Sequence, residues 1–243
     1  MKNNSREMEK IEEFAKSTLG GMPEVIKLLG NHNVDLAKEQ FRENTELYLG
    51  RTNVPKKILP LIALAVSLAN GQSSSAMIHF KLAKSFGSQM LEVLDAIKAS
   101  KMAVMSSTMS VMKSIVPIME RHSGKKNSPD EVNKVIENIK KESGFNSIPL
   151  SLESTAMLSI DMVSEHMKEK TELLSPFMLD QKYMYLMAFS VEVSLSFDEC
   201  AQIYLEKFFL SGGTKGEAED AISIARFITG NKVITSAIEI LKW

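Results

Sequence analysis

The sequence predicts an all-α protein, because three observations agree on helix along nearly the whole chain. Apolar residues recur at spacings of three and four, as the buried face of an amphipathic helix requires. The 7 prolines and 12 glycines are sparse among 243 residues, and they fall between the periodic segments. No stretch alternates polar and apolar residues as a half-buried strand would.

The periodic segments define the expected helices. In the first part of the chain these are residues 6–18, 23–29, 34–49, 55–69, 73–86 and 89–121. In the second part they are residues 129–142, 152–174, 180–195, 197–210, 215–229 and 232–241. Ser128 before Pro129 is typical of a helix start, and Ser196 with Glu199 predicts a capping box. The polar segment 122–128 is the best candidate for a linker.

Composition and charge exclude several classes of partner. Lysine and arginine total 29 against 30 acidic residues, so the net charge of −1 does not favour nucleic acid. The longest apolar run, 58–69, contains Pro60 and is too short for a membrane span. Residues 1–16 are charged throughout and do not resemble a secretory signal. With a single cysteine, Cys200, the chain cannot form an internal disulfide, and we expect a cytoplasmic protein.

No motif for a cofactor or metal is present in the sequence. It contains no phosphate-binding loop, nucleophile elbow or zinc signature. His32, His122 and His166 are not spaced as metal ligands. We therefore expect neither a cofactor nor a metal.

The two parts of the chain repeat each other at a nearly constant offset. At an offset of 125, Lys57, Ala63, Gly87, Glu92 and Asp95 meet identical residues. Upstream the offset becomes 126, where residues 23, 43 and 45–47 are matched. Matched glycines and prolines at turns are harder to explain by chance than matched helical residues. The sequence thus predicts two helical repeats, 1–122 and 129–243, packed as a pseudo-twofold pair with a shared core.

Residues 54–97 carry a recognisable pattern: a lysine-rich helix start, the segment ALAVSLANG, a histidine on the next helix, a glycine turn and an acidic residue before Ala-Ile. This stretch resembles the core helices of the alkylhydroperoxidase D and carboxymuconolactone decarboxylase family. Residues 179–222 are similar to it. The resemblance implies two copies of that family's helical unit and assembly of the chain into a homo-oligomer, with a trimer expected.

The peroxidase branch of this family uses Cys-x-x-Cys-x-x-x-His with a glutamate twelve residues before the first cysteine. In the first copy the resemblance places His79 at the histidine, Ser75 and Gln72 at the two cysteines, and Pro60 at the glutamate. The histidine alone is kept. The decarboxylase branch does not depend on the cysteine pair, so the first copy is closer to that pattern.

In the second copy the same alignment places Cys200 at the second cysteine and Tyr204 at the histidine. Phe197 stands at the first cysteine and Tyr185 at the glutamate. A lone thiol has no resolving partner, so the family's intramolecular disulfide cannot form in either copy. The degenerate motifs put the usual peroxidase activity in doubt.

Three functions remain open at this point. The first is acid-base chemistry on a small organic acid or lactone. In it His79 acts as acid, base or orienting donor, Ser75 lies one turn away, and Gln72 binds substrate. It predicts a closed polar pocket around His79; the simpler alternative is a buried histidine that is merely hydrogen-bonded.

The second function is a peroxide-related oxidoreductase in which Cys200 works with an external thiol and Tyr204 donates a hydrogen bond. A helix start favours the thiolate of Cys200, whereas Asp198 and Glu199 beside it oppose the thiolate. Cys200 could equally be a small core residue. The third function is a non-catalytic protein used for assembly or ligand binding, with both former sites filled by side chains such as Phe197 and Tyr185.

Overall fold

The computed structural model describes residues 2–19, 21–123, 127–143 and 148–243, and within these ranges it contains helices and turns but no strand. The first half contributes α1 (Lys2–Leu19), α2 (Glu24–His32), α3 (Val34–Glu43), the π-helix η1 (Asn44–Leu49), α4 (Leu59–Ala69), α5 (Ser73–Ser85), α6 (Met90–Met109) and α7 (Met112–Ser123). The second half contributes α8 (Pro129–Ser143), α9 (Leu150–Leu158), α10 (Ile160–Leu174), α11 (Gln181–Leu195), α12 (Asp198–Leu210), α13 (Lys215–Ser236) and α14 (Ile238–Leu241). The predicted all-α class is confirmed. Within the predicted linker, residues 124–126 lie outside the described residues.

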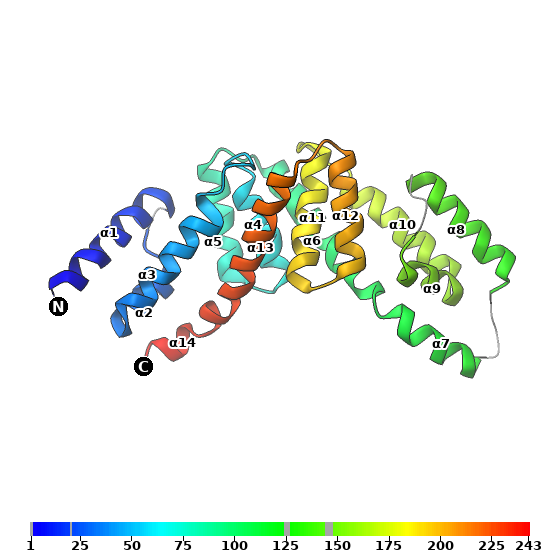
Figure 1. Cartoon of the computed structure of the whole chain (residues 1–243), viewed down its shortest axis with the longest axis horizontal. Coiled ribbons are helices and arrows are strands. Elements are labelled where there is room, and N and C mark those ends of the chain that lie inside the picture. Colours follow the sequence, from blue (N-terminus) through cyan, green and yellow to red (C-terminus); the bar gives the residue numbers. More distant parts are fainter. Residues whose placement is uncertain (1, 20, 124–126, 144–147) are drawn as a thin grey trace.

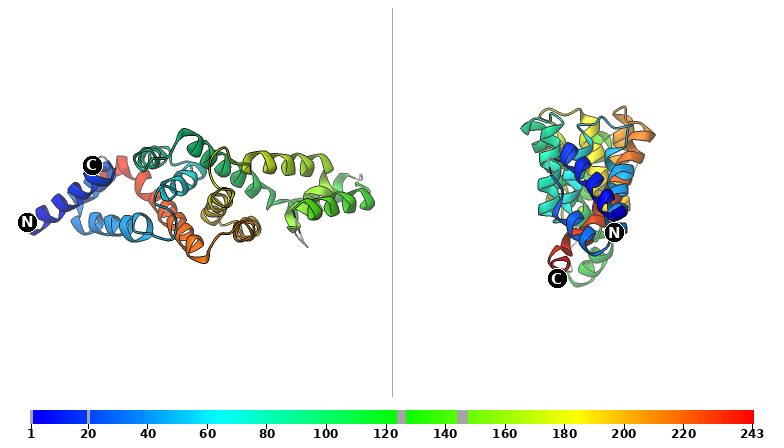
Figure 2. Two further views of the ribbon diagram at one scale, coloured as in Figure 1. Left: turned by 90° about the horizontal axis from the view of Figure 1, so that it is seen from above. Right: turned by 90° about the vertical axis from the view of Figure 1, so that its left-hand side faces the viewer.

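The helices form a long body with a central bundle and two ends (Figure 1). The bundle contains α4, α5, α6, α11, α12 and α13, so both halves of the chain contribute to it. One end holds α1 to α3 together with α14, and the other holds α7 to α10 (Figure 1). Seen from above, the two ends extend in opposite directions from the bundle (Figure 2).

One hydrophobic core runs through the bundle and joins the two halves. Helix α4 is buried on every side from Leu59 to Ser67, which explains why its sequence is apolar all round. The long helix α6 of the first half packs against α10 and α11 of the second half. The long helix α13 of the second half packs against η1 and α4 of the first. Neither half therefore closes its core alone.

The same exchange of contacts occurs at the two ends of the molecule. Met109 at the end of α6 joins an apolar cluster with Ala156 and Val163 of the second half. Ile234 near the end of α13 packs against a cluster that contains Ile26 of the first half. Each long helix thus reaches across the bundle to the first helices of the other half.

Asp220 of α13, in the second half, forms hydrogen bonds and an ion pair with the loop before α4. Its buried carboxylate accepts hydrogen bonds from the backbone N–H groups of Asn53 and Val54, at 2.8 and 3.1 Å. Arg51 adds an ion pair through Nε at 2.8 Å. The backbone N–H groups of this loop, which have no partner within a helix, are thus hydrogen-bonded by a residue of the other half.

Asp95 of α6, in the first half, makes the equivalent contact with the loop before α11 in the second half. Its carboxylate accepts from the backbone N–H groups of Phe177, Met178 and Leu179, at 2.7, 2.9 and 3.0 Å. Asp95 and Asp220 are 125 residues apart, the offset at which the sequence repeats. The two contacts are therefore reciprocal.

The tight turns between helices also match at this offset. Gly71 and Ser196 both adopt the left-handed conformation, with φ of 70° and 60°. Gly87 and Gly212 do so as well, with φ of 86° and 85°. The predicted capping box at Ser196 is wrong. Ser196 is the left-handed residue that ends α11, and Phe197 begins α12 without a side-chain cap.

The conformation of Ser196 leads to a stability prediction. A side chain at positive φ is strained, whereas glycine adopts this region freely. Because glycine also has more freedom when unfolded, we expect Ser196→Gly to raise the free energy of unfolding by only about 0.5–1 kcal/mol. Urea unfolding measures this change, and Gly212→Ala is the matched opposite, which should destabilise. A stabilising Gly212→Ala would contradict the argument.

Four predicted helices are interrupted in the structure, and one of them, 232–241, is broken at Ala237 between α13 and α14. Residues 89–121 form α6 and α7, which are bent by 47° relative to each other. Ser159 divides residues 152–174 because its side chain caps the start of α10, accepting from the Met162 N–H. Among the described residues no single helix is long and apolar enough to cross a membrane, and only α6 and α7 taken as a bent pair reach the required length and composition.

The interruption within predicted helix 34–49 changes α3 into the π-helix η1. The wider turn ends at Gly50, whose N–H bonds the carbonyl of Thr45 at 2.7 Å. A Cβ at position 50 would lie 2.5 Å from that carbonyl oxygen, so only glycine fits there. The π-helix places Tyr48 wholly inside the protein. Such local widening often occurs at functional sites.

Candidate functional site

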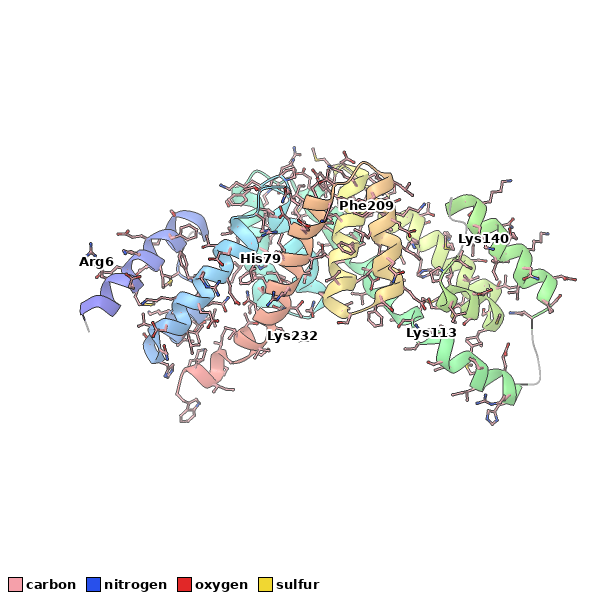
Figure 3. All side chains as sticks on the ribbon, in the orientation of Figure 1. Arg6, His79, Lys113, Lys140, Phe209 and Lys232 are labelled. Carbon is pink, nitrogen blue, oxygen red and sulfur yellow. The ribbon has the colours of Figure 1, made fainter. Side chains whose placement is uncertain are left out.

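The first candidate site surrounds His79, which lies on α5 inside one half of the molecule, beside α13 (Figure 3). Nδ1 of His79 lies 3.2 Å from the hydroxyl of Tyr48, and the two rings meet edge to face. Phe227 of α13 stacks on the other side of Tyr48, with ring centroids 6.1 Å apart. Residues from η1, α5 and the opposite half's long helix therefore build this site together.

Both members of the pair are uncharged at neutral pH. Burial lowers the pKa of His79 to about 3, because the imidazolium would lose its hydration. Burial raises the pKa of Tyr48 well above its ordinary value. A neutral imidazole facing a protonated phenol is the stable arrangement, and His79 is a weak base in this environment.

The hydrogen bond also selects the tautomer of His79. The buried Tyr48 hydroxyl has no other partner among the described residues, so its O–H is satisfied by donating to Nδ1. Nδ1 is then the acceptor and Nε2 carries the proton. In the described part of the chain no hydrogen bond is made to Nε2, so this N–H is available to a ligand.

A cavity of about 70 Å³ adjoins this pair. Its polar lining consists of Gln40, Asn44, Tyr48, Ser75, His79, Asn231 and Thr235. Gln40 and Asn231 bond each other at 2.8 Å and so join the two halves across the cavity. The cavity is partly open and most of its surface is apolar, so it differs from the closed polar pocket predicted around His79. Its volume equals only about two water molecules.

Ser75 and Gln72 are held by other partners. Ser75 lines the cavity, but its Oγ pairs with Ser67 at 3.1 Å rather than with His79. Gln72 donates to the carbonyl of Ile228 at 3.0 Å, and its own Oε1 is buried without a partner in the described structure. The spacing of Ser75 correctly predicted its face of α5, while Gln72 connects α5 to α13.

The second candidate site surrounds Cys200 on α12. Its thiol donates to the carbonyl of Ser106 on α6, at 3.6 Å. Tyr204, one turn later, is fully buried and pairs with the Ser106 hydroxyl at 2.8 Å. Lys170 of α10 lies over the Tyr204 ring, 4.9 Å from its centre. As at the first site, the opposite half's long helix contributes a residue.

Glu192 of α11 is the unexpected member of this second group. Its side chain is wholly buried, and in the described structure neither carboxylate oxygen has a hydrogen-bond partner. Burial raises its pKa to about 8, against the lowering effect of Lys170, so it is protonated at neutral pH. Burial lowers the pKa of Lys170 in turn.

This environment does not activate Cys200. Burial raises the pKa of its thiol to about 12, with Glu192 adding to the effect. Since the thiolate is the reactive form, Cys200 is a poor nucleophile at neutral pH. Tyr204 keeps its proton for the same reason, since burial raises its pKa.

Sequence reasoning missed Tyr48, Lys170 and Glu192. Glu192 had a signal, because it is the only charged residue between Tyr183 and Phe197 in an apolar helix. Tyr48 and Lys170 had none, because each reaches its site from a helix remote in sequence. The described residues hold no group of three or more histidine, cysteine or acidic side chains placed to bind a metal.

Comparison with known proteins bears on this fold. No family model matches the sequence, and no curated protein matches it. A crystal structure from Burkholderia xenovorans, described as a "putative gamma-carboxymuconolactone decarboxylase subunit", does match, with a TM-score of 0.78. The alignment covers 96% of this chain and 95% of that chain. This chain has the carboxymuconolactone decarboxylase fold.

The agreement extends over nearly the full length of both proteins, so the fold includes the end helices as well as the bundle. Sequence identity over the alignment is 15%. At that level the carboxymuconolactone decarboxylase fold is shared, while the chemistry must be argued from the residues of this chain.

Proposed function

We propose that this chain is a carboxymuconolactone-decarboxylase-like enzyme in which His79 acts on a small carboxylated lactone. The observation that carries the proposal is the Tyr48–His79 pair, which leaves Nε2–H without a partner among the described residues, beside a small cavity that His79 lines. His79 then serves as hydrogen-bond donor and acid, because an imidazole with a pKa of about 3 is a weak base.

The chemistry fits a lactone with a conjugated carbonyl and a carboxylate on its γ-carbon. The bond to the carboxylate breaks, CO₂ leaves, and the electron pair moves through the ring to the carbonyl oxygen. Nε2–H of His79 stabilises the charge that develops on this oxygen, as an oxyanion-binding group does. A proton returned to the ring carbon completes the reaction without any oxidant.

Two further observations support this substrate class. The matching structure is described as a gamma-carboxymuconolactone decarboxylase subunit, and its fold covers nearly all of this chain. The cavity beside His79 has a mainly apolar surface with a few amide and hydroxyl groups, which suit the apolar ring and the carbonyl group of such a ligand. Its volume of about 70 Å³ admits the reacting end of the ligand only.

The test is a decarboxylation assay with a panel of γ-carboxylated butenolides, followed by CO₂ release. We expect His79→Ala to lower kcat/KM by about 10²-fold or more, since positioned acid-base groups contribute this much. Tyr48→Phe removes the hydrogen bond that selects the tautomer of His79, and it should lower kcat/KM by about tenfold. His122→Ala removes an exposed histidine of α7 and is the matched control, with no effect.

The pH profile separates this role from an ordinary histidine base. With a pKa of about 3, His79 does not titrate between pH 5 and 8, so the rate should show no inflection near pH 6.5. An inflection near 6.5 that disappears in His79→Ala would contradict the proposed donor role. Absence of activity on the whole panel would favour the non-catalytic alternative.

We also infer that the two halves are copies of one helical unit, with repeats at 1–122 and 129–243. The reciprocal carboxylate contacts of Asp95 and Asp220 support it, as do the left-handed turns at the same offset. Lys57–Glu92 at 2.6 Å and Lys182–Glu217 at 2.7 Å form a further matched pair. The sites of His79 and Cys200 are then equivalent positions in the two copies.

Assembly into a homo-oligomer stays a prediction, with a trimer expected from the resemblance. The exposed face of α7 supports it, because Ile115, Ile118 and Met119 are all more than a third exposed in the single chain. Apolar patches of this kind mark contact surfaces. A cytoplasmic location is likewise still a prediction.

A further inference from the structure

A cavity larger than the one beside His79 lies in the second half of the chain. It has a volume of about 360 Å³, and residues of α8, α9, α10, α11 and α12 line it. This volume lies in the range of small-molecule sites. Leu152, Leu174 and Ile203 are among its apolar walls. The cavity is therefore large enough for a ligand with an apolar body.

Lys170 gives this cavity its specific polar group. It lines the cavity from α10 and is half-buried. Lysines elsewhere on the shared core are paired: Lys57 with Glu92 and Lys182 with Glu217. Lys170 forms no ion pair with any acidic residue that the structure describes. Burial lowers the pKa of Lys170, because its ammonium group loses hydration, and an anion bound beside it would supply the missing counter-ion.

Several aromatic and charged groups surround Lys170. Its ammonium is held over the Tyr204 ring at 4.9 Å, so its position is defined by packing. Glu192 lies close enough to raise the pKa of Lys170, but neither of its carboxylate oxygens makes a hydrogen bond in the described structure, Lys170 included. Lys207 also lines the cavity, and Glu142 of α8 lies exposed at its edge.

We propose that this cavity binds a small monocarboxylate with an apolar body, whose carboxylate pairs with Lys170 while the body packs on Leu152, Leu174 and Ile203. The hydroxyl of Tyr185, which also lines the cavity, is a second group able to donate to the carboxylate. The apolar walls disfavour a strongly hydrated dianion, which would leave its remaining oxygens without donors. This site is separate from the His79 site and does not depend on its chemistry.

The test is calorimetric titration of the full chain at pH 7 with 4-phenylbutanoate and with its neutral isostere, 4-phenylbutanamide. We expect saturable 1:1 binding of the carboxylate, at least tenfold tighter than that of the amide. Lys170→Met, which keeps the stem of the side chain, should weaken the carboxylate at least tenfold and leave the amide unchanged. Lys170→Arg should keep most of the carboxylate affinity.

Two further variants control the interpretation. Lys101→Met removes an exposed positive charge from α6 and should not change binding. Ile203→Trp fills the cavity and should abolish binding of both probes. Equal affinity for the two probes, or unchanged carboxylate affinity in Lys170→Met, would overturn the proposal. The decarboxylation assay, run on Lys170→Met beside these titrations, separates an effect on binding in this cavity from an effect on the His79 chemistry.

Discussion

Asp220→Ala is expected to lower the free energy of unfolding by about 3–5 kcal/mol, the cost of removing one partner of a buried, hydrogen-bonded ion pair. The Asp220 side chain is 1% exposed and accepts from Arg51 and from two backbone N–H groups. Alanine removes the acceptor of these donors, and the N–H of the buried Val54 is then left unsatisfied. Urea unfolding followed by circular dichroism gives the change.

Two further variants serve as the equivalent change and the control for Asp220→Ala. Asp95→Ala removes the reciprocal contact and should also destabilise strongly, because three backbone N–H groups lose their acceptor. Glu219→Ala removes an exposed carboxylate of the same helix, α13, and should change stability by less than about 0.5 kcal/mol. If Asp220→Ala and Glu219→Ala behaved alike, the two halves would not be held together by these carboxylates.

Glu192→Gln is expected to stabilise the protein, by an amount that grows with pH. In the folded chain burial raises the pKa of Glu192 to about 8, against 4.5 as its ordinary value. Below pH 4.5 both folded and unfolded chains carry the proton, so the stability is fully present. As the pH rises from 4.5 to 8, only the unfolded chain gives up the proton, and stability is lost across this window.

Glutamine has the same shape but does not titrate, so the free energy of unfolding of Glu192→Gln should not fall across this pH window. At about 1.4 kcal/mol per pKa unit, the variant should exceed the wild type by about 3 kcal/mol at pH 7. The two proteins should be nearly equal at pH 4. Thermal unfolding at pH 4, 5.5, 7 and 8 measures the difference, with the exposed Glu165→Gln as a flat control. A difference that did not vary with pH would contradict burial of an ionisable Glu192.

Only a part of the His79 site followed from local sequence. The helical spacing of Ser75 and His79 correctly placed both on one cavity. It did not predict that Ser75 would bond Ser67, eight residues earlier on α4. Likewise, the capping pattern at Ser196 was outweighed by a left-handed turn that closes α11 against α12. At Ser196 the packing of two helices overrode the local capping preference.

Sequence by itself determined that the chain is all-helical, where most helices lie and that neither motif holds two cysteines. These properties depend on residues close together in the chain, whose spacing is read directly. The tertiary structure alone decided that Tyr48 meets His79 and that Lys170, Glu192 and Cys200 share one buried site. These groups come from different helices, and the periodicity of one helix carries no information about which other helix it will face.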